Sequence, residues 1–275
     1  MPLNTLELGE AARRAIEKLE RTLARKSHEG GFFGVPTGLL TGEGWDARYG
    51  TIPPEAFPVL DDGVDGAHYA LWLDDPSWDV EPCVVHVAPM DSNDSDTTLG
   101  SIHVVAETAD DFLTAIGAKG WKRALGPARR LTTSLSLHRD ARIKRLMARR
   151  RGYATLQTLD GMGVRCRPER DRETPAPGDA PDTRSLRTDG EAARRFLERL
   201  VDQGRAATAV TMVRDLLTLG CGTEEWFPAL FSSAYAAAGR PLLAEVAARA
   251  YLLPPEQRQL LVAFRAGLKS TDVER

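Results

Sequence analysis

Three short apolar runs follow one another between residues 68 and 106, and no helix-length segment separates them. They are HYALWL at 68–73, CVVHVA at 83–88 and SIHVVA at 101–106, and turn-forming residues lie between them. Parallel neighbours would need a long crossover between the strands, mostly a helix, whereas antiparallel neighbours do not. The spacing therefore predicts a small antiparallel sheet, and it places the chain in the α+β class.

Helical patterns flank the predicted sheet. Apolar residues recur at helical spacing over 6–27, and Asn4 is in position to cap the helix that this pattern predicts. Residues 30–66, rich in Gly, Pro and Asp, are predicted to form a long irregular connection. After the last strand, Thr108 followed by two aspartates predicts the start of another helix.

Residues 166–187 carry prolines and charges with almost no apolar residues, which is typical of a linker. They divide a predicted α+β domain, 1–165, from a predicted all-α helical-hairpin domain, 188–275. The first domain is expected to end with a basic helix at 138–150 and a short hairpin or strand at 153–165. The second contains helical segments at 189–203, 206–219, 223–237, 241–252 and 255–268. Gly204 and Gly239 occupy corresponding places in it, which fits either a helical repeat or a plain bundle.

Charge is strongly segregated, although the net charge is only −3. Residues 43–111 carry sixteen acidic side chains and one arginine, whereas residues 118–151 carry twelve bases and one aspartate. One interpretation is neutralisation within the molecule. The other is an acidic surface that captures a basic partner and speeds association by electrostatic steering. Binding to nucleic acid is disfavoured because the acidic segment would repel phosphate.

The composition favours a protein of the cytoplasm. Cys83, Cys166 and Cys221 lie far apart and form no CxxC pair, which disfavours a disulfide framework and a thiolate zinc site. The N-terminal residues lack the basic and apolar regions of a signal peptide. No apolar stretch reaches the roughly 18–20 residues of a membrane span, so we expect no membrane contact.

Enzymatic motifs are absent from the sequence. It has no GxSxG, no Walker lysine and no GxGxxG after a strand. His68, His86 and His103 lie on three neighbouring predicted strands, but no HxH or HExxH spacing supports a metal site. The loop that begins at Asp91 departs from the EF-hand pattern. We therefore expect neither catalysis nor a bound cofactor or metal.

Residues 57–113 resemble the SUKH superfamily, which includes bacterial toxin-immunity proteins and a fungal cell-wall regulator. The matching marks are the Gly-x-Asp-Gly turn at 63–66, the strand with Tyr69 and Trp72, the apolar strand that ends in Ala88-Pro89, and the Val-Ala…Asp-Phe-Leu close at 105–113. The resemblance implies a SUKH-like fold and a protein-binding module for bacterial competition. It implies an immunity protein that neutralises a cognate toxin, often a nuclease.

Charge and resemblance together predict a mechanism of occlusion, in which carboxylates of this chain cover the toxin's basic surface. The candidate partner-binding residues are Asp61, Asp62, Asp65, Trp72, Asp74, Asp75, Trp78 and Asp79. In this interpretation a tryptophan anchors the interface. Two rival functions stay open: an adaptor that recruits a partner through the helical tail, and a metal-dependent hydrolase that uses the strand histidines.

Overall fold

The computed structural model describes residues 8–28, 52–61, 68–75, 78–88, 101–119, 155–166 and 183–250. Its helices are α1 (Glu10–His28), α3 (Ala109–Lys119), α7 (Thr183–Leu186), α8 (Gly190–Asp202), α9 (Ala206–Thr218), the 3-10 helix η4 (Cys221–Thr223), α10 (Phe227–Ala237) and α11 (Pro241–Ala250). Its strands are β1 (Ala56–Asp61), β2 (His68–Trp72), β3 (Cys83–Ala88), β4 (Ser101–Ala106), β5 (Thr155–Leu156) and β6 (Val164–Arg165). This is an α+β protein, as predicted. The predicted helices 138–150 and 255–268 lie outside the described residues.

The central sheet is antiparallel with strands in sequential order, β1-β2-β3-β4. Three of its strands are those that the apolar runs predict. The fourth, β1, lies in the segment predicted to be irregular, so that prediction is wrong for residues 56–61. Pro58 obscures the strand pattern, and it is tolerated because β1 is an edge strand whose pairing with β2 shifts register between Pro58 and Leu60.

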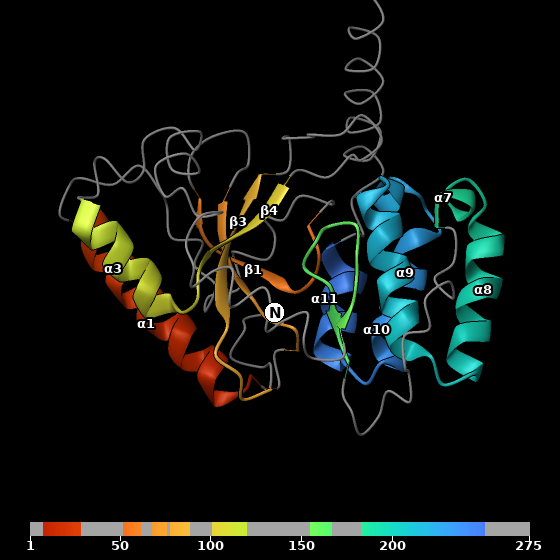
Figure 1. Ribbon diagram of the computed structural model, residues 1–275, viewed down its shortest axis with the longest axis horizontal. Coiled ribbons are helices and arrows are strands. Elements are labelled where there is room, and N and C mark those ends of the chain that lie inside the picture. The colour runs from red at the N-terminus through yellow and green to blue at the C-terminus, as the bar shows by residue number, and fades with distance from the viewer. Residues whose placement is uncertain are drawn as a thin grey trace, which may run out of the picture.

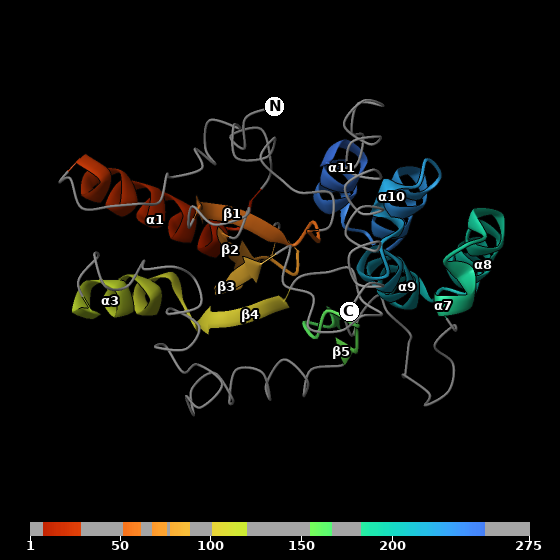
Figure 2. The same cartoon turned by 90° about the horizontal axis from the view of Figure 1, so that it is seen from above.

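Helices lie on both sides of the sheet (Figures 1 and 2). On one side, α1 and α3 lie against each other, and Ile16, Leu19 and Phe112 are buried in the core with Tyr69 of β2. On the other side, α9, α10 and α11 face the sheet, and the β5–β6 hairpin lies between it and α9. The sheet therefore forms the middle layer of the molecule.

The C-terminal helices form two hairpins with the same turn. Gly204 follows α8 and Gly239 follows α10, and both have positive φ, 70° and 67°. In each case the next residue is an arginine whose backbone N–H donates to a carbonyl in the last turn of the preceding helix: Arg205 to Leu200 at 2.8 Å, and Arg240 to Tyr235 at 2.9 Å. Glycine suits this left-handed position because it has no Cβ. The predicted correspondence of the two glycines is confirmed.

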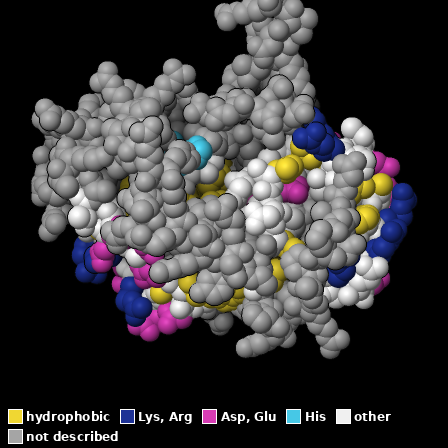
Figure 3. Space-filling view, viewed as in Figure 1, with side chains coloured by type: hydrophobic (Ala, Val, Ile, Leu, Met, Phe, Trp, Pro, Cys, Tyr) yellow, Lys and Arg dark blue, Asp and Glu magenta, His cyan; other side chains and the backbone are white. Residues whose placement is uncertain are grey.

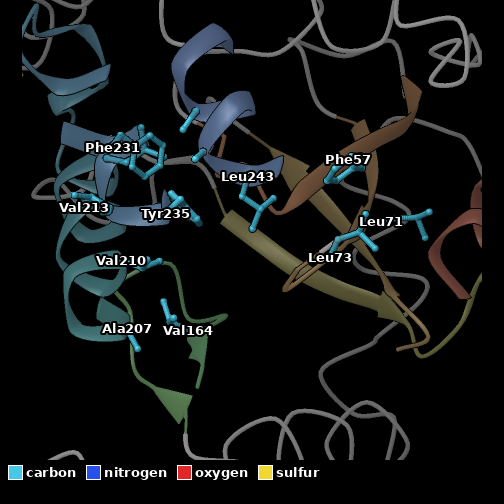
Figure 4. Packing of buried hydrophobic residues seen from close by; sticks show 14 of the residues in the cluster. Phe57, Leu71, Leu73, Val164, Ala207, Val210, Val213, Phe231, Tyr235 and Leu243 are labelled. Carbon is cyan, nitrogen blue, oxygen red and sulfur yellow. The ribbon is translucent and has the colours of Figure 1, made fainter. Parts of the chain in front are cut away.

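One apolar cluster runs through both halves of the chain. It joins Phe57 and Leu73 beside the sheet to Val210 and Tyr235 of the helices. Figure 4 shows Val164 of the hairpin close to Ala207 and Val210 of α9, and Tyr235 and Leu243 on the part of the helical layer nearest the sheet. The predicted division into independently folding domains stays a prediction, but these contacts make the two halves share a core.

Candidate functional site

Three of the predicted partner-binding residues lie inside the molecule. Trp72 is 1% exposed, Asp74 9% and Asp75 4%. The indole N–H of Trp72 donates to Asp74 Oδ1 at 3.3 Å, so the two side chains bind each other. A partner could touch them only if the described layers separated. The structure therefore places these three residues in the interior, and we do not retain them as surface contacts.

The next two predicted residues, Trp78 and Asp79, serve structural contacts. Trp78 is half-buried, and the guanidinium groups of Arg165 and Arg240 lie 5.9 and 5.7 Å from its ring centroid. Asp79 is exposed, but its Oδ1 accepts the backbone N–H of Ala11 at 2.8 Å, in the first turn of α1. Asp79 thus caps a helix from a distant part of the sequence.

The remaining three predicted residues belong to the chain segment that runs from the end of β1 to the start of β2. Asp61 is the last residue of β1 and pairs with His68 of β2. The structure describes its backbone but not its side chain. Asp62 and Asp65 lie outside the described residues. The strands on either side of this segment, β1 and β2, pair with each other in the sheet, whereas the sequence predicts only the second of them.

A charged group not predicted from the sequence lies where the sheet meets the C-terminal helices. We call Glu55, Asp160, Arg214 and Tyr235 the junction cluster. Arg214 of α9 donates from Nε and Nη2 to Asp160 Oδ2 at 3.0 and 2.5 Å, and from Nη1 to the Gly163 carbonyl at 2.7 Å. Its Nη1 also lies 3.6 Å from Glu55 Oε1. The side chains of Arg214, Glu55 and Asp160 are each only 1% exposed.

Glu55 is held from two elements of the helical layer. The Tyr235 hydroxyl of α10 lies 2.8 and 2.9 Å from its two carboxylate oxygens. Burial raises the pKa of Glu55, while Arg214 and Arg240 oppose that rise. Burial and the neighbouring Glu55 carboxylate raise the pKa of Tyr235 well above its ordinary value. Burial favours the neutral form of Arg214, yet Asp160 and Glu55 together keep its pKa above normal, so it stays charged.

A second arginine fastens the end of β2 to the hairpin. Arg240, 3% exposed, donates from Nη1 to the Asp74 carbonyl at 3.1 Å and from Nη2 to the Arg165 carbonyl at 2.5 Å. Arg165 Nη1 lies 3.9 Å from Asp74 Oδ2. Arginines of the same chain therefore neutralise two carboxylates of the acidic segment. Arg214 and Arg240 act on Glu55, and Arg165 lies beside Asp74.

Among the residues that the structure describes, three exposed carboxylates of the acidic segment lie near α1. We call Asp79, Glu81 and Asp110 the acidic edge; all three residues are exposed. Asp110 forms an ion pair with Lys18 of α1. Burial, with the neighbouring Asp110, raises the pKa of Glu81, while Arg14 and Lys18 oppose that rise. Acidic and basic side chains intermingle over this part of the surface (Figure 3).

The three strand histidines do not converge. His86 pairs directly with His103 across β3 and β4, and its ring lies 5.1 Å from that of Tyr69. His68 lies on the other face of the sheet, as strand alternation predicts. Within the described part of the chain, no three His, Cys, Asp or Glu side chains gather as metal ligands do. All three cysteines are described, and each is buried and forms no disulfide.

Sequence reasoning missed the junction cluster because its members are separated by up to 180 residues. One local signal existed: Arg214 and Asp215 interrupt the otherwise largely apolar run AVTMVRDLL of α9. A charged residue in a helix buried on nearly all sides must find a partner. No comparable signal marked Glu55, which stands in a stretch rich in prolines.

Comparison with known proteins adds no assignment. No protein-family model matches this chain, and no curated protein matches its sequence. No helix among the described residues is long and apolar enough to cross a membrane.

Proposed function

We propose that this protein is a cytoplasmic, non-catalytic immunity protein of the SUKH type, which binds a basic cognate toxin and covers its working surface. The observation that carries the proposal is the order of elements in residues 56–119. Four antiparallel strands in sequential order lead directly into α3, and this region contains the segment that resembles the superfamily. The strand with Tyr69 and Trp72 is β2, and the segment that contains Phe112 and Leu113 is part of α3; both support the proposal.

The disposition of the carboxylates supports a binding role over a catalytic one. Glu55 and Asp74 are engaged by Tyr235, Arg240 and Arg165 of the same chain. These carboxylates therefore stabilise the fold. Within the described part of the acidic segment, the acidic edge offers carboxylates on which a basic partner could dock, and we propose the segment between β1 and β2 as a second docking part. A nuclease is one toxin class that fits, since it needs a basic surface for phosphate.

Co-expression with the product of the neighbouring gene tests the proposal. We expect a stoichiometric complex in which the partner's toxicity disappears and whose affinity falls steeply as salt is raised. No complex and no protection would overturn the immunity function. A protective complex whose affinity is indifferent to salt would keep that function and reject its electrostatic basis.

Charge reversal maps the contact. One variant changes Asp61, Asp62 and Asp65 to lysine, and a second changes Glu81 and Asp110 to lysine. Because buried or steering charge pairs at interfaces are each worth on the order of 1–2 kcal/mol, at least one variant should bind about tenfold more weakly or worse. The matched control reverses Glu198 and Asp202, which are exposed on α8. Unchanged affinity in both test variants would move the interface elsewhere.

The repeated helical hairpins support a second candidate, an adaptor. Helices α8–α9 and α10–α11 turn at equivalent glycines, a pattern of repeat proteins that bind peptides or partner helices. Helix α9 packs against the β5–β6 hairpin and α8 packs on α9 and α10, so a partner would use the outer side of α8, where Arg194, Arg195 and Glu198 are exposed. In the mapping experiment above, weaker binding by the α8 variant alone would favour this function.

A further inference from the structure

The dipeptide Asp-Gly occurs four times in the chain, and the structure describes two of these pairs. The pairs at 62–63 and 65–66 lie outside the described residues, whereas 160–161 stands in the loop of the β5–β6 hairpin and 189–190 at the start of α8. An aspartate before a glycine can close a five-membered succinimide ring, because glycine has no Cβ to shield its backbone nitrogen. The two described pairs share this chemistry but differ in their surroundings.

Ring closure and reopening need no oxidant, reductant or cofactor. The glycine nitrogen forms a bond to the aspartate Cγ, and the carboxyl OH leaves with the amide proton as water. Water then opens the ring. When it breaks the bond between the glycine nitrogen and the backbone carbonyl carbon of the aspartate, the product is isoaspartate, which has one more main-chain atom and a side chain shorter by one CH₂.

Both reacting groups of the Asp160-Gly161 pair are engaged in the folded hairpin. Asp160 Oδ1 accepts the Thr158 hydroxyl at 2.6 Å and the Met162 N–H at 2.9 Å. Its Oδ2 accepts Nε and Nη2 of Arg214 at 3.0 and 2.5 Å, and the side chain is 1% exposed. The Gly161 N–H donates to the Thr158 carbonyl at 3.0 Å. Ring closure breaks these bonds, so it requires the loop to leave Arg214.

The Asp189-Gly190 pair provides an internal reference. Asp189 is exposed, and its Oδ1 accepts the Ala192 N–H at 2.9 Å as the cap of α8. Gly190 is the first residue of α8, where backbone N–H groups have no acceptor within the helix. Ring closure here needs only the cap bond to open.

We propose that Asp160-Gly161 is a latent isoaspartate site, whose ring closes while the hairpin loop is detached from Arg214 and whose product prevents the loop from docking again. With a shorter side chain on a longer main chain, residue 160 cannot restore both bonds to the guanidinium, and Arg214 is left beside Glu55. Transient opening of the loop thereby becomes a permanent change in the junction cluster. The inference goes beyond the proposed function and does not depend on it.

Ageing the full-length protein near neutral pH, both folded and in concentrated guanidinium chloride, tests the site. Peptide mapping with electron-transfer fragmentation measures isoaspartate at each pair. Because opening must separate a buried ion pair, formation at Asp160 should be at least about 100-fold slower in the folded protein than in denaturant. Loss of an exposed cap costs less, so formation at Asp189 should slow by about tenfold or less. Equal slowing at both pairs, or no isoaspartate at Asp160 in denaturant, would overturn the proposal.

Thr158→Val separates opening of the loop from unfolding of the whole protein. It removes the hydroxyl that binds Asp160 and accepts the Gly163 N–H at 2.8 Å, so isoaspartate at Asp160 should form about tenfold faster, with no change at Asp189. Thr211→Val is the matched control, because that hydroxyl donates within α9, to the Ala207 carbonyl at 3.0 Å. An unchanged rate at Asp160 in Thr158→Val, or an equal rise at Asp189, would contradict control by the loop.

Amide exchange tests whether the product prevents docking. Protein that is aged in denaturant and then refolded contains both forms of residue 160, and the corresponding peptides separate by chromatography. In the docked loop the Leu159 N–H donates to Asp215 Oδ1 at 2.8 Å. We expect the Leu159 amide to be protected in the aspartate form and to exchange freely in the isoaspartate form. Equal protection in the two forms would overturn this part of the proposal.

Discussion

Arg214 holds together three segments that are far apart in the sequence. Its guanidinium binds Asp160 in the hairpin, approaches Glu55 before β1 and lies 5.0 Å from the centroid of the Trp72 ring. Removing these charged groups from water costs free energy. The attraction between the guanidinium and the carboxylates compensates for this cost only when all of them are present. We therefore expect the cluster to contribute more to a unique arrangement of sheet and helices than to net stability.

Arg214→Met tests this role at the scale of one residue. Methionine has a similar volume but leaves Glu55 and Asp160 buried without their cation, so the free energy of unfolding should fall by about 3–5 kcal/mol. Urea denaturation followed by circular dichroism measures it. Arg195→Met is the control, because Arg195 forms an exposed pair with Glu191 at 3.7 Å and should cost no more than about 0.5 kcal/mol. Equal losses in the two variants would contradict the central role of Arg214.

The N-termini of α3 and α1 are capped in two ways, one by a residue next to the helix and the other by a residue far away in the sequence. Thr108 caps α3 through a bond from the Asp111 N–H to its Oγ1 at 3.1 Å, as the sequence predicts. The predicted start of the first helix near residue 6 is wrong, since α1 begins at Glu10. Its cap comes from Asp79, and Gly9 lies so close to the Trp78 carbonyl that an added Cβ would stand 2.2 Å from that oxygen. The tertiary contact at residues 78–79 therefore determines where α1 starts.

Asp79→Ala should destabilise the protein by about 1 kcal/mol, the ordinary cost of losing an N-terminal helix cap. The physical reason is the loss of the acceptor for the Ala11 N–H. Thermal denaturation of the full chain measures the effect. Asp79→Asn keeps an acceptor oxygen and should recover most of the stability. If asparagine and alanine are equally destabilising, the loss arises from charge and not from capping.

At the scale of the whole molecule, the helical layer completes the sheet. Trp72 and Met162 are buried on the side of the sheet that faces the hairpin, and α9 covers the hairpin in turn. Val164 and Leu73 belong to the same apolar cluster as Val210 of α9. A chain that lacks residues 188–275 would expose this surface.

Deleting residues 188–275 tests whether the predicted linker is a domain boundary. From the shared core we expect the shortened protein to lose its cooperative thermal transition, because about 25 cal/mol is lost for each Å² of apolar surface that returns to water. Near-ultraviolet circular dichroism and denaturation curves give the answer. A fragment that unfolds cooperatively with unchanged aromatic signals would instead establish 1–165 as an independent domain.

Sequence alone determined the features whose causes are local. Alternation and strand spacing determined β2, β3 and β4, while Thr108 determined the start of α3. Positive-φ glycines determined the turns of the two helical hairpins. In each case the physical cause acts within a few residues, so a single stretch of chain is enough to predict the result.

Tertiary structure alone decided which acidic residues are internal. Asp74 and Asp75 follow a strand, as acidic residues of exposed turns do, yet both are buried, and Arg240 of the helical layer binds the Asp74 carbonyl. The sequence did not predict β1 because Pro58 is compatible with a strand only at the edge of a sheet, and the position of a strand in the sheet is a tertiary property. The junction cluster joins residues 55, 160, 214 and 235, and its pairing depends on how whole layers stack. Burial and long-range electrostatics depend on three-dimensional proximity, and no window of sequence contains that information.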